Sequence, residues 1–248
     1  MSRSAGEIVY GRRPVAEAKR GRRRVRRVWT VEEVGEAELT ERAGSPDHQG
    51  VVAEVDPFPY ADPGALLEGA DAMVVALDEV QDPHNLGAVC RSAEAAGASG
   101  VVICERRAAG ISAAVCKASA GAVEHLQVAR IRNLADWLVA AKRTDGVWVY
   151  GAEVGAADPY SQVDMTGPLI LVLGSEGKGI RPRVAAACDA LVSIPVRGRT
   201  ASLNVSSAAA VLLFEAVRQR AASEGPPHRR SSGRTPETAT RLASEPPG

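Results

Sequence analysis

IPVRGRTASLNVSSAAAVLLFEAVRQR, residues 194–220, runs from an apolar strand end through a basic loop into an apolar helix. Arg197 and Arg199 lie in the loop, and Asn204, Ser206 and Ser207 are residue types that commonly cap a helix N-terminus. A basic loop that leads into a capped helix presents backbone N–H groups to a polar ligand. The stretch alone fits an ordinary C-terminal helix equally well, so two upstream stretches decide between a binding site and a structural element.

The first of these, LDEVQDPHNLGAVCRSAEAAG at residues 77–97, predicts a strand end, an acidic turn and a helix that Asn85 opens. Arg91 lies six residues beyond Asn85, which is less than two helical turns. Both side chains are therefore expected near the carboxyl edge of a sheet, where open α/β folds bind ligands. Each residue alone is more simply explained, Asn85 as an N-cap and Arg91 as a solvated charge.

The second, LILVLGSEGKGI at residues 169–180, is an apolar strand followed by a glycine-rich turn with a lone carboxylate. Glu176 occupies the second glycine position of a G-x-G-x-x-G dinucleotide fingerprint, and no G-K-[ST] follows at P-loop spacing. The turn lets a backbone approach a ligand closely. Its carboxylate favours a partner that is cationic or donates hydrogen bonds, although a plain strand-to-helix turn explains the glycines too.

The region around these stretches alternates short apolar runs with helical patterns. Strands are predicted at 73–77, 100–104, 147–150, 169–173 and 191–194, and helices at 86–96, 112–120, 134–142, 182–187 and 205–220. Such alternation predicts an α/β fold with a parallel sheet.

The rest of the chain divides by composition. Residues 1–56 are predicted to form a small basic α+β domain, with a strand end at 8–11, a helix starting at Pro14, a strand at 25–31, a helix at 36–42 and a strand at 50–55. Residues 57–70 are a Pro- and Asp-rich linker, residues 71–222 the α/β domain, and residues 223–248 a tail expected to be disordered. About fifty residues are marginal for independent folding.

Composition limits the function classes. The 248 residues are 45% hydrophobic and 24% charged, with no apolar run long enough to span a membrane. The four cysteines are widely spaced, which predicts reduced thiols in a cytoplasmic protein and argues against a metal site. The net charge of zero hides ten Lys or Arg against two Glu in residues 1–30. This basic block predicts either a nucleic-acid contact surface or a solvated arm.

Three motifs in order are far more specific than any one of them. They are D-P-H-N-L-G-A-x-x-R-S-A (82–93), L-G-S-E-G-x-G (173–179) and I-P-V-x-G-x-x-x-S-L-N-V-S-x-A-x-A-x-x-L-F-E (194–215). The series resembles the motifs of the SpoU (TrmH-type) RNA ribose 2′-O-methyltransferases of the SPOUT superfamily. G-R-R-P-V-A-E-A (11–18) and H-Q-G-V-V-A-E-V (48–55) resemble the RNA-binding domain of its bacterial 23S rRNA guanosine methyltransferases, shortened here between Ala18 and His48.

The resemblance implies a parallel SPOUT fold with a C-terminal trefoil knot, a homodimer, and S-adenosylmethionine (AdoMet) as the cofactor. Carried over by position, the cofactor-binding residues are Leu173, Gly174, Glu176, Gly179, Ile194, Pro195, Leu203 and Asn204. The catalytic residues are Arg91, Asn85, Glu176, Ser202 and Asn204.

The resemblance also implies the reaction and its partners. A ribose 2′-hydroxyl must lose its proton as it attacks the methyl group, and the family's counterpart of Arg91 is proposed to activate it. Because arginine is effectively always protonated, we expect Arg91 to stabilise the developing oxyanion or a nearby phosphate. The expected substrate is RNA and not DNA, with 23S rRNA favoured over tRNA or an antibiotic-resistance rRNA site. A non-catalytic RNA-binding or ribosome-assembly protein on the same scaffold is the alternative of another class.

Overall fold

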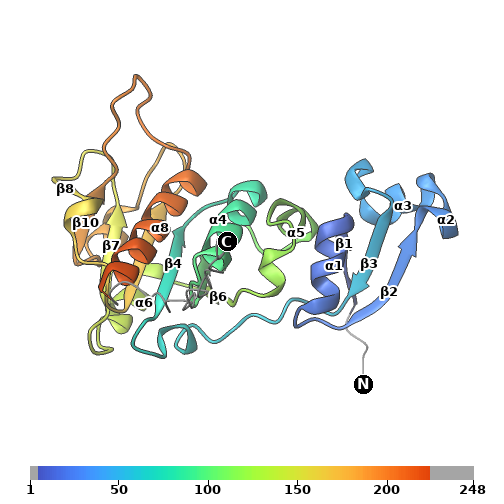
Figure 1. Ribbon diagram of the computed structural model, residues 1–248, viewed down its shortest axis with the longest axis horizontal. Coiled ribbons are helices and arrows are strands. Elements are labelled where there is room, and N and C mark those ends of the chain that lie inside the picture. Colours follow the sequence, from blue (N-terminus) through green and yellow to red (C-terminus); the bar gives the residue numbers. More distant parts are fainter. Residues whose placement is uncertain (1–4, 224–248) are drawn as a thin grey trace, which may run out of the picture.

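A seven-stranded, wholly parallel sheet forms the larger part of the computed structural model, which describes residues 5–223 (Figure 1). The strand order is β6-β5-β4-β9-β7-β10-β8. The strands are β4 (Met73–Asp78), β5 (Gly100–Cys104), β6 (Val128–Ile131), β7 (Trp148–Ala152), β8 (Asp158–Pro159), β9 (Leu169–Gly174) and β10 (Ala190–Ser193). The helices are α4 (Pro83–Ala95), α5 (Ala113–Ala118), α6 (Leu134–Ala141), α7 (Pro182–Ala185) and α8 (Val205–Ser223). The predicted parallel α/β fold is confirmed.

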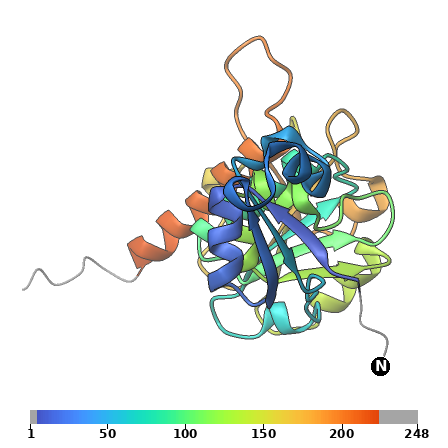
Figure 2. The same ribbon diagram turned by 90° about the vertical axis from the view of Figure 1, so that its right-hand side faces the viewer.

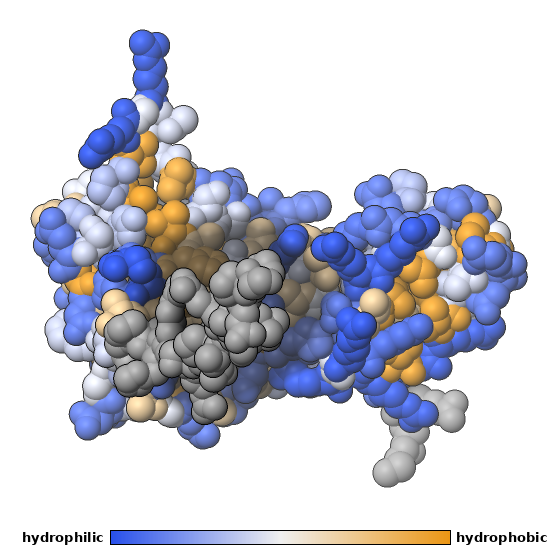
Figure 3. Space-filling view, viewed as in Figure 1, coloured by the Kyte–Doolittle hydropathy of each residue, from blue (hydrophilic) through white to orange (hydrophobic). Residues whose placement is uncertain are grey.

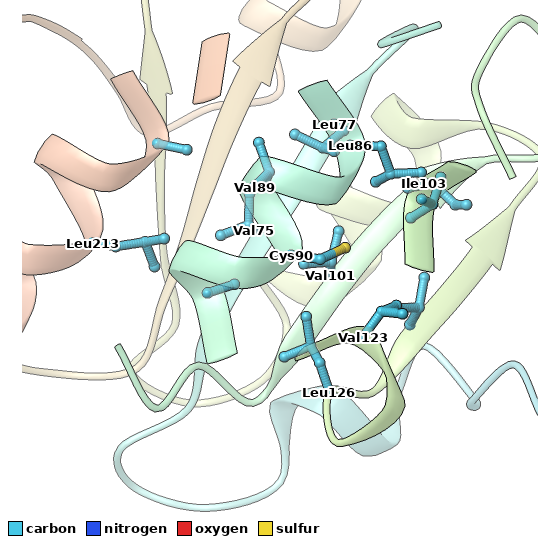
Figure 4. Packing of buried hydrophobic residues seen from close by; sticks show 14 of the residues in the cluster. Val75, Leu77, Leu86, Val89, Cys90, Val101, Ile103, Val123, Leu126 and Leu213 are labelled. Atoms are coloured by element: carbon cyan, nitrogen blue, oxygen red, sulfur yellow. The ribbon is translucent and has the colours of Figure 1, made fainter. Parts of the chain in front are cut away.

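The sheet is covered by helices on both faces, which is why its central strands are apolar throughout. Every residue of β4 and β5 is buried. Val75 and Leu77 of β4 pack with Leu86 and Val89 of α4 (Figure 4), in a cluster that also includes residues of α5 and α8. The alternate β4 residues pack with α6 and α7 on the opposite face. Two-sided burial requires the continuous apolar runs seen in the sequence.

β4 marks the point where the strand order reverses. The chain passes from β4 to β5 and β6 on one side and places β9 on the other side of β4. In register, Asp78 at the end of β4 pairs with Gly174 at the end of β9. Open α/β sheets bind ligands beyond the strand ends at such a switch point. The topology therefore brings the two upstream motifs together.

A smaller lobe precedes this domain. It contains an antiparallel sheet of order β1-β3-β2, made by β1 (Glu7–Tyr10), β2 (Val25–Thr30) and β3 (Val51–Val55). The helices α1 (Arg12–Arg20), α2 (Val31–Val34) and α3 (Glu36–Ala43) accompany it, and Figure 2 shows this lobe end-on. Its own apolar cluster has only four buried residues, Tyr10, Trp29, Leu39 and Val52.

The small lobe is joined to the large one by a shared core and a buried ion pair. Val9 and Val15 belong to the same apolar cluster as Val115 of α5. Arg23 donates from Nε to Glu124 at 2.9 Å, and both side chains are almost completely buried. Burial alone would lower the pKa of Arg23, but its hydrogen bonds to Glu124 raise it. Removing Arg23 would leave the buried carboxylate of Glu124 without its ion-pair partner, so the pair holds the lobes in a fixed relation.

Residues 57–70 are not a free tether. Phe58 packs into the shared core, and its ring lies 5.4 Å from the Arg23 guanidinium. Leu66 and Leu67, in a short 3₁₀ helix, pack against the other face of the sheet. Ala61 forms an isolated parallel bridge with Ala129. The predicted linker is therefore an ordered strap over the large domain.

Several sequence-based boundaries need correction. α1 begins at Arg12 and not at Pro14, and α4 begins at Pro83 and not near Asn85. β6 and β8 were not predicted, because four and two residues respectively are too short to show a period. α8 continues to Ser223, and the predicted disordered tail otherwise lies outside the described residues. Within residues 5–223, no helix combines the length and apolar character of a membrane span.

All four cysteines are free, as predicted. Burial raises the pKa of the Cys90 and Cys116 thiols to about 12. A thiol with so high a pKa stays protonated near neutral pH and reacts poorly. Cys90 therefore serves as a small apolar core residue, whereas the Cys116 sulfur also makes hydrogen bonds with Arg23 and Glu124.

Candidate active site

A solvent-open pocket of about 230 Å³ lies beyond the carboxyl ends of β4 and β9. It occupies the switch point of the sheet, where two loops and the start of α8 converge. Its lining residues are Glu79, Val80, Gln81 and Asp82 after β4, Asn85 of α4, Ser175, Glu176 and Lys178 after β9, and Val205 of α8. All three motifs of the sequence contribute to this one pocket.

Asn85, Glu176 and Asn204, one from each motif, form a hydrogen-bonded cluster at the pocket. Asn85 donates from Nδ2 to Glu176 Oε1 at 2.9 Å. Asn204 donates from Nδ2 to Asn85 Oδ1, also at 2.9 Å, and to Glu176 Oε1. Two amides thus hold one carboxylate oxygen and leave the other without a partner among the described residues. The free oxygen can accept a hydrogen bond from a ligand or face a positive charge.

The helix that follows Asn204 fixes the orientation of its amide. Asn204 Oδ1 accepts hydrogen bonds from the backbone N–H of Ser206 at 2.8 Å and from its hydroxyl at 2.6 Å. This is the N-cap arrangement that the sequence predicted. Because the oxygen is engaged by the helix, the amide nitrogen must face the pocket. The same side chain therefore caps helix α8 and contributes a donor to the site.

Asn85 has a different role from the N-cap that its position suggested. Asp82 caps α4 instead, by accepting a hydrogen bond from the backbone N–H of His84 at 2.8 Å. Asn85 consequently lies inside the first turn with its side chain free to reach Glu176. The structural explanation of Asn85 as a cap is wrong, which strengthens its assignment to the site.

The glycine-rich turn is closed by contacts that admit no side chain at Gly174. A Cβ on Gly174 would lie 2.0 Å from the carbonyl carbon of Gly179. Gly177 and Gly179 adopt positive φ angles of 78° and 64°, which glycine reaches at little cost. The backbone N–H of Gly179 donates to the Ser175 carbonyl at 3.0 Å. The turn holds Glu176 at its outer rim.

The sequence analysis missed the clamp that fixes this turn. Arg181 donates its backbone N–H and its Nε to the buried carboxylate of Asp78, both at 2.8 Å, and its Nη1 lies 3.0 Å from Glu79. The hydrogen bond to Asp78 raises the pKa of Arg181. Glu79 has a φ of 57°, a left-handed conformation that costs free energy in a residue other than glycine. Two features of the sequence could have indicated this clamp: the adjacent carboxylates Asp78 and Glu79 at the end of a strand, and an arginine directly after the glycine-rich turn.

Other predicted site residues are not brought into the cluster. Arg91 is exposed on α4, and its side chain makes no hydrogen bond or ion pair within residues 5–223. Ser202 is exposed, as are Pro195 and Leu203, because the segment between β10 and α8 projects from the body (Figures 1 and 2). Figure 3 shows that its tip is hydrophilic. Leu173 is buried in the core, so only its backbone is available to a ligand.

Changing Asn204 to Asp separates its two roles. Aspartate caps a helix as well as asparagine does, so the stability of the protein is expected to change by less than about 1 kcal/mol. The new carboxylate would replace a donor with a second negative charge beside Glu176, so ligand binding at the pocket should fall at least tenfold. Thermal unfolding and ligand titration measure the two effects. Equal binding by N204D and wild type would show that the amide donor is not needed.

A comparison with protein-family models identifies the family of the domain that contains this pocket. Residues 72–214 match the model of the SpoU rRNA Methylase family, which covers more than half of the chain and contains every residue of the pocket. The chain belongs to the SpoU family.

Relatives within the SpoU family are similar over most of this chain. An uncharacterized tRNA/rRNA methyltransferase of Synechocystis is 37% identical over 89% of this chain, and the chain spans 64% of that relative's length. A 23S rRNA (guanosine-2′-O-)-methyltransferase, RlmB, of Photobacterium profundum is 41% identical over 77% of this chain and 79% of its own.

A solved structure extends the likeness to both lobes. The SpoU methyltransferase AviRb of Streptomyces viridochromogenes, in complex with the cofactor AdoMet, is 28% identical, with a TM-score of 0.74. The match covers 88% of this chain and 92% of AviRb. The small N-terminal lobe is thus part of the likeness.

Proposed function

We propose that the protein transfers a methyl group from AdoMet to a ribose 2′-oxygen in structured RNA. The observation that carries this proposal is the Asn85–Glu176–Asn204 cluster at the switch point of a SpoU domain. Two donors hold one oxygen of a carboxylate, and the other is available to a cationic or hydroxyl-bearing ligand. A SpoU relative of the same architecture binds AdoMet.

The pocket suits AdoMet chemically. When bound, AdoMet supplies an electrophilic methyl group on a positively charged sulfur. The open side of the turn at Gly177, where a Cβ would meet nothing within 4 Å, leaves the turn backbone accessible to a ligand. The residues that we assign to AdoMet binding are Leu173, Gly174, Glu176, Gly179, Ile194, Pro195, Leu203 and Asn204. Of these, Pro195 and Leu203 are exposed, so their side chains are accessible to a ligand.

The remaining residues would act on the ribose. Arg91 is an unpaired guanidinium about 9 Å along α4 from Asn85, at 1.5 Å per residue. We assign it to the developing oxyanion or to the adjacent phosphate, because a guanidinium does not give up its proton. Ser202 and Asn204 would orient the hydroxyl. We also propose that the C-terminal part of the fold forms a trefoil knot. A homodimer would complete the active site, and the exposed Phe214 on α8 is a suitable contact for a second copy.

Ribosomal RNA is the favoured substrate. A relative that is 41% identical over 77% of this chain bears the name of a 23S rRNA guanosine 2′-O-methyltransferase. The small lobe carries the basic block and packs rigidly on the large domain, so it is suited to hold RNA at a fixed distance from the pocket.

The test has two stages. AdoMet binding is measured by calorimetry, and then tritium transfer from labelled AdoMet is measured with total rRNA and total tRNA as acceptors. We expect label in rRNA, at a 2′-O-methyl position that can be mapped by comparing cells with and without the protein. Label in tRNA alone would move the substrate to tRNA. AdoMet binding without transfer to either RNA would favour a non-catalytic RNA-binding protein.

A further inference from the structure

We infer that the seam between the two lobes holds a second RNA site, a basic hollow that binds backbone phosphates of the substrate. The hollow has a volume of about 290 Å³ and lies between α1 of the small lobe and α5 of the large domain. It is lined by Arg12, Arg13, Pro14, Gln49, Lys117 and Ala120. Three cations and no carboxylate face it. This inference rests on the proposed function and names the surface that holds the RNA.

The structure distinguishes these cations from five other basic residues of the N-terminal block. Arg20, Arg23 and Arg26 are engaged in ion pairs with carboxylates. Arg22 donates to the Leu126 carbonyl, and Arg27 lies over the Trp29 ring. Much of the block is therefore neutralised or occupied within the fold.

Arg12 and Arg13 form no ion pair with any residue of the described range 5–223. Arg12 donates from Nε to the Gln49 carbonyl at 3.3 Å, which aims the guanidinium and leaves its terminal nitrogens as free donors. Arg13 is exposed and has no side-chain partner in that range. The N-terminus of α1 adds its positive dipole end at the same place. Although Arg12 also interacts electrostatically with Glu32, the hollow collects positive charge that no described carboxylate within ion-pair distance neutralises.

Lys117 brings the large domain into the hollow. Its Nζ donates to the Asp47 carbonyl at 2.8 Å and lies 5.8 Å from the centre of the Tyr10 ring. A Cβ on Gly11 would lie only 2.9 Å from this nitrogen, so Gly11 permits the approach. The ammonium group keeps donors for an anion. An anion in the hollow would contact both lobes.

The position of the hollow suits a strand of RNA that continues to the active site. α5 packs against α4, whose first turn carries Asn85. In Figure 1 the starts of α1 and α4 lie on the same, upper side of the molecule, at the carboxyl edge of the parallel sheet. Arg91 is a further exposed cation on α4. A polyanion is the partner that matches the cations of the hollow and Arg91.

The experiment measures RNA binding as a function of salt concentration, using a fluorescein-labelled RNA stem-loop and the full-length protein. The variants are Arg13→Gln, Lys117→Gln and the double variant. Each lost phosphate contact should lower the slope of log K against log salt by about 1. The double variant should bind about tenfold more weakly at moderate salt. AdoMet affinity, measured by calorimetry, should stay unchanged and would report any misfolding.

Arg143→Gln is the matched control, because Arg143 is exposed, forms no ion pair in the described part of the chain, and follows α6 on the opposite face of the sheet. An unchanged salt slope in the double variant would overturn the inference. So would an equal fall in slope with Arg143→Gln. Wild-type protein that binds RNA through the hollow but transfers no methyl group would refute the proposed function and leave the inference standing.

Discussion

Replacing Arg91 by alanine is expected to abolish methyl transfer to RNA while AdoMet binds as before. The guanidinium is exposed on α4 and takes no part in the hydrogen bonds of the Asn85–Glu176–Asn204 cluster. Its removal should therefore leave the cofactor pocket intact and take away only the charge that we propose stabilises the reacting oxygen. Loss of one such electrostatic group typically lowers turnover by about 10²- to 10³-fold. Single-turnover tritium transfer and calorimetric titration of AdoMet provide the two measurements.

Arg91→Lys tests the same role more finely. Lysine keeps the charge but not the planar fork of donors, so partial activity is expected. Arg143→Ala serves as the control for loss of an exposed arginine elsewhere. Near-full turnover by R91A would remove Arg91 from the chemistry. An equal loss of AdoMet binding would show instead that Arg91 supports the cofactor site.

Gly174→Ala is expected to have the largest effect on stability and to remove AdoMet binding. The new methyl group would lie 2.0 Å from the Gly179 carbonyl carbon and 2.3 Å from the Ile180 nitrogen. Both neighbours are backbone atoms, so the turn itself would have to move, and with it Glu176. Overpacking of this kind costs about 3 kcal/mol. Thermal unfolding and AdoMet titration of the purified variant measure the two losses.

Gly177→Ala is the matched control in the same turn. Gly177 has a φ of 78°, but nothing lies within 4 Å of a Cβ placed there. Alanine at this position should cost only the left-handed backbone conformation, about 1 kcal/mol. A similar loss in both variants would mean that backbone conformation, and not the contact between Gly174 and Gly179, governs the turn.

The candidate site could be predicted in part because its residues lie at the ends of strands and helices. Glu176 follows an apolar strand within a glycine-rich turn, and Asn204 precedes an apolar helix. The role of Asn85 could not be derived in the same way, because an asparagine at a helix start is indistinguishable from a cap. Only the hydrogen bond between Asp82 and His84 shows that the cap is elsewhere. Arg181 was missed because its partner, Asp78, is 103 residues away.

The basic N-terminal block shows that the sequence also cannot predict which charged side chains form ion pairs. Arg13 and Arg23 are ten residues apart and identical in type, yet one is exposed and unpaired and the other is buried against Glu124. Composition predicts a positive surface but cannot say which charges remain available. The pairing depends on how the small lobe packs on α5 and on the 3₁₀ helix that carries Glu124.

The sequence by itself determined the alternation of strands and helices, the glycine turn and the cap of α8, because periodicity, glycine spacing and capping act over a few residues. The tertiary structure alone decided that Asn85 and Asn204, 119 residues apart, meet at Glu176. That meeting depends on β9 pairing beside β4, a long-range choice made by burial of both faces of the sheet. Local sequence patterns do not indicate which strands become neighbours in the sheet.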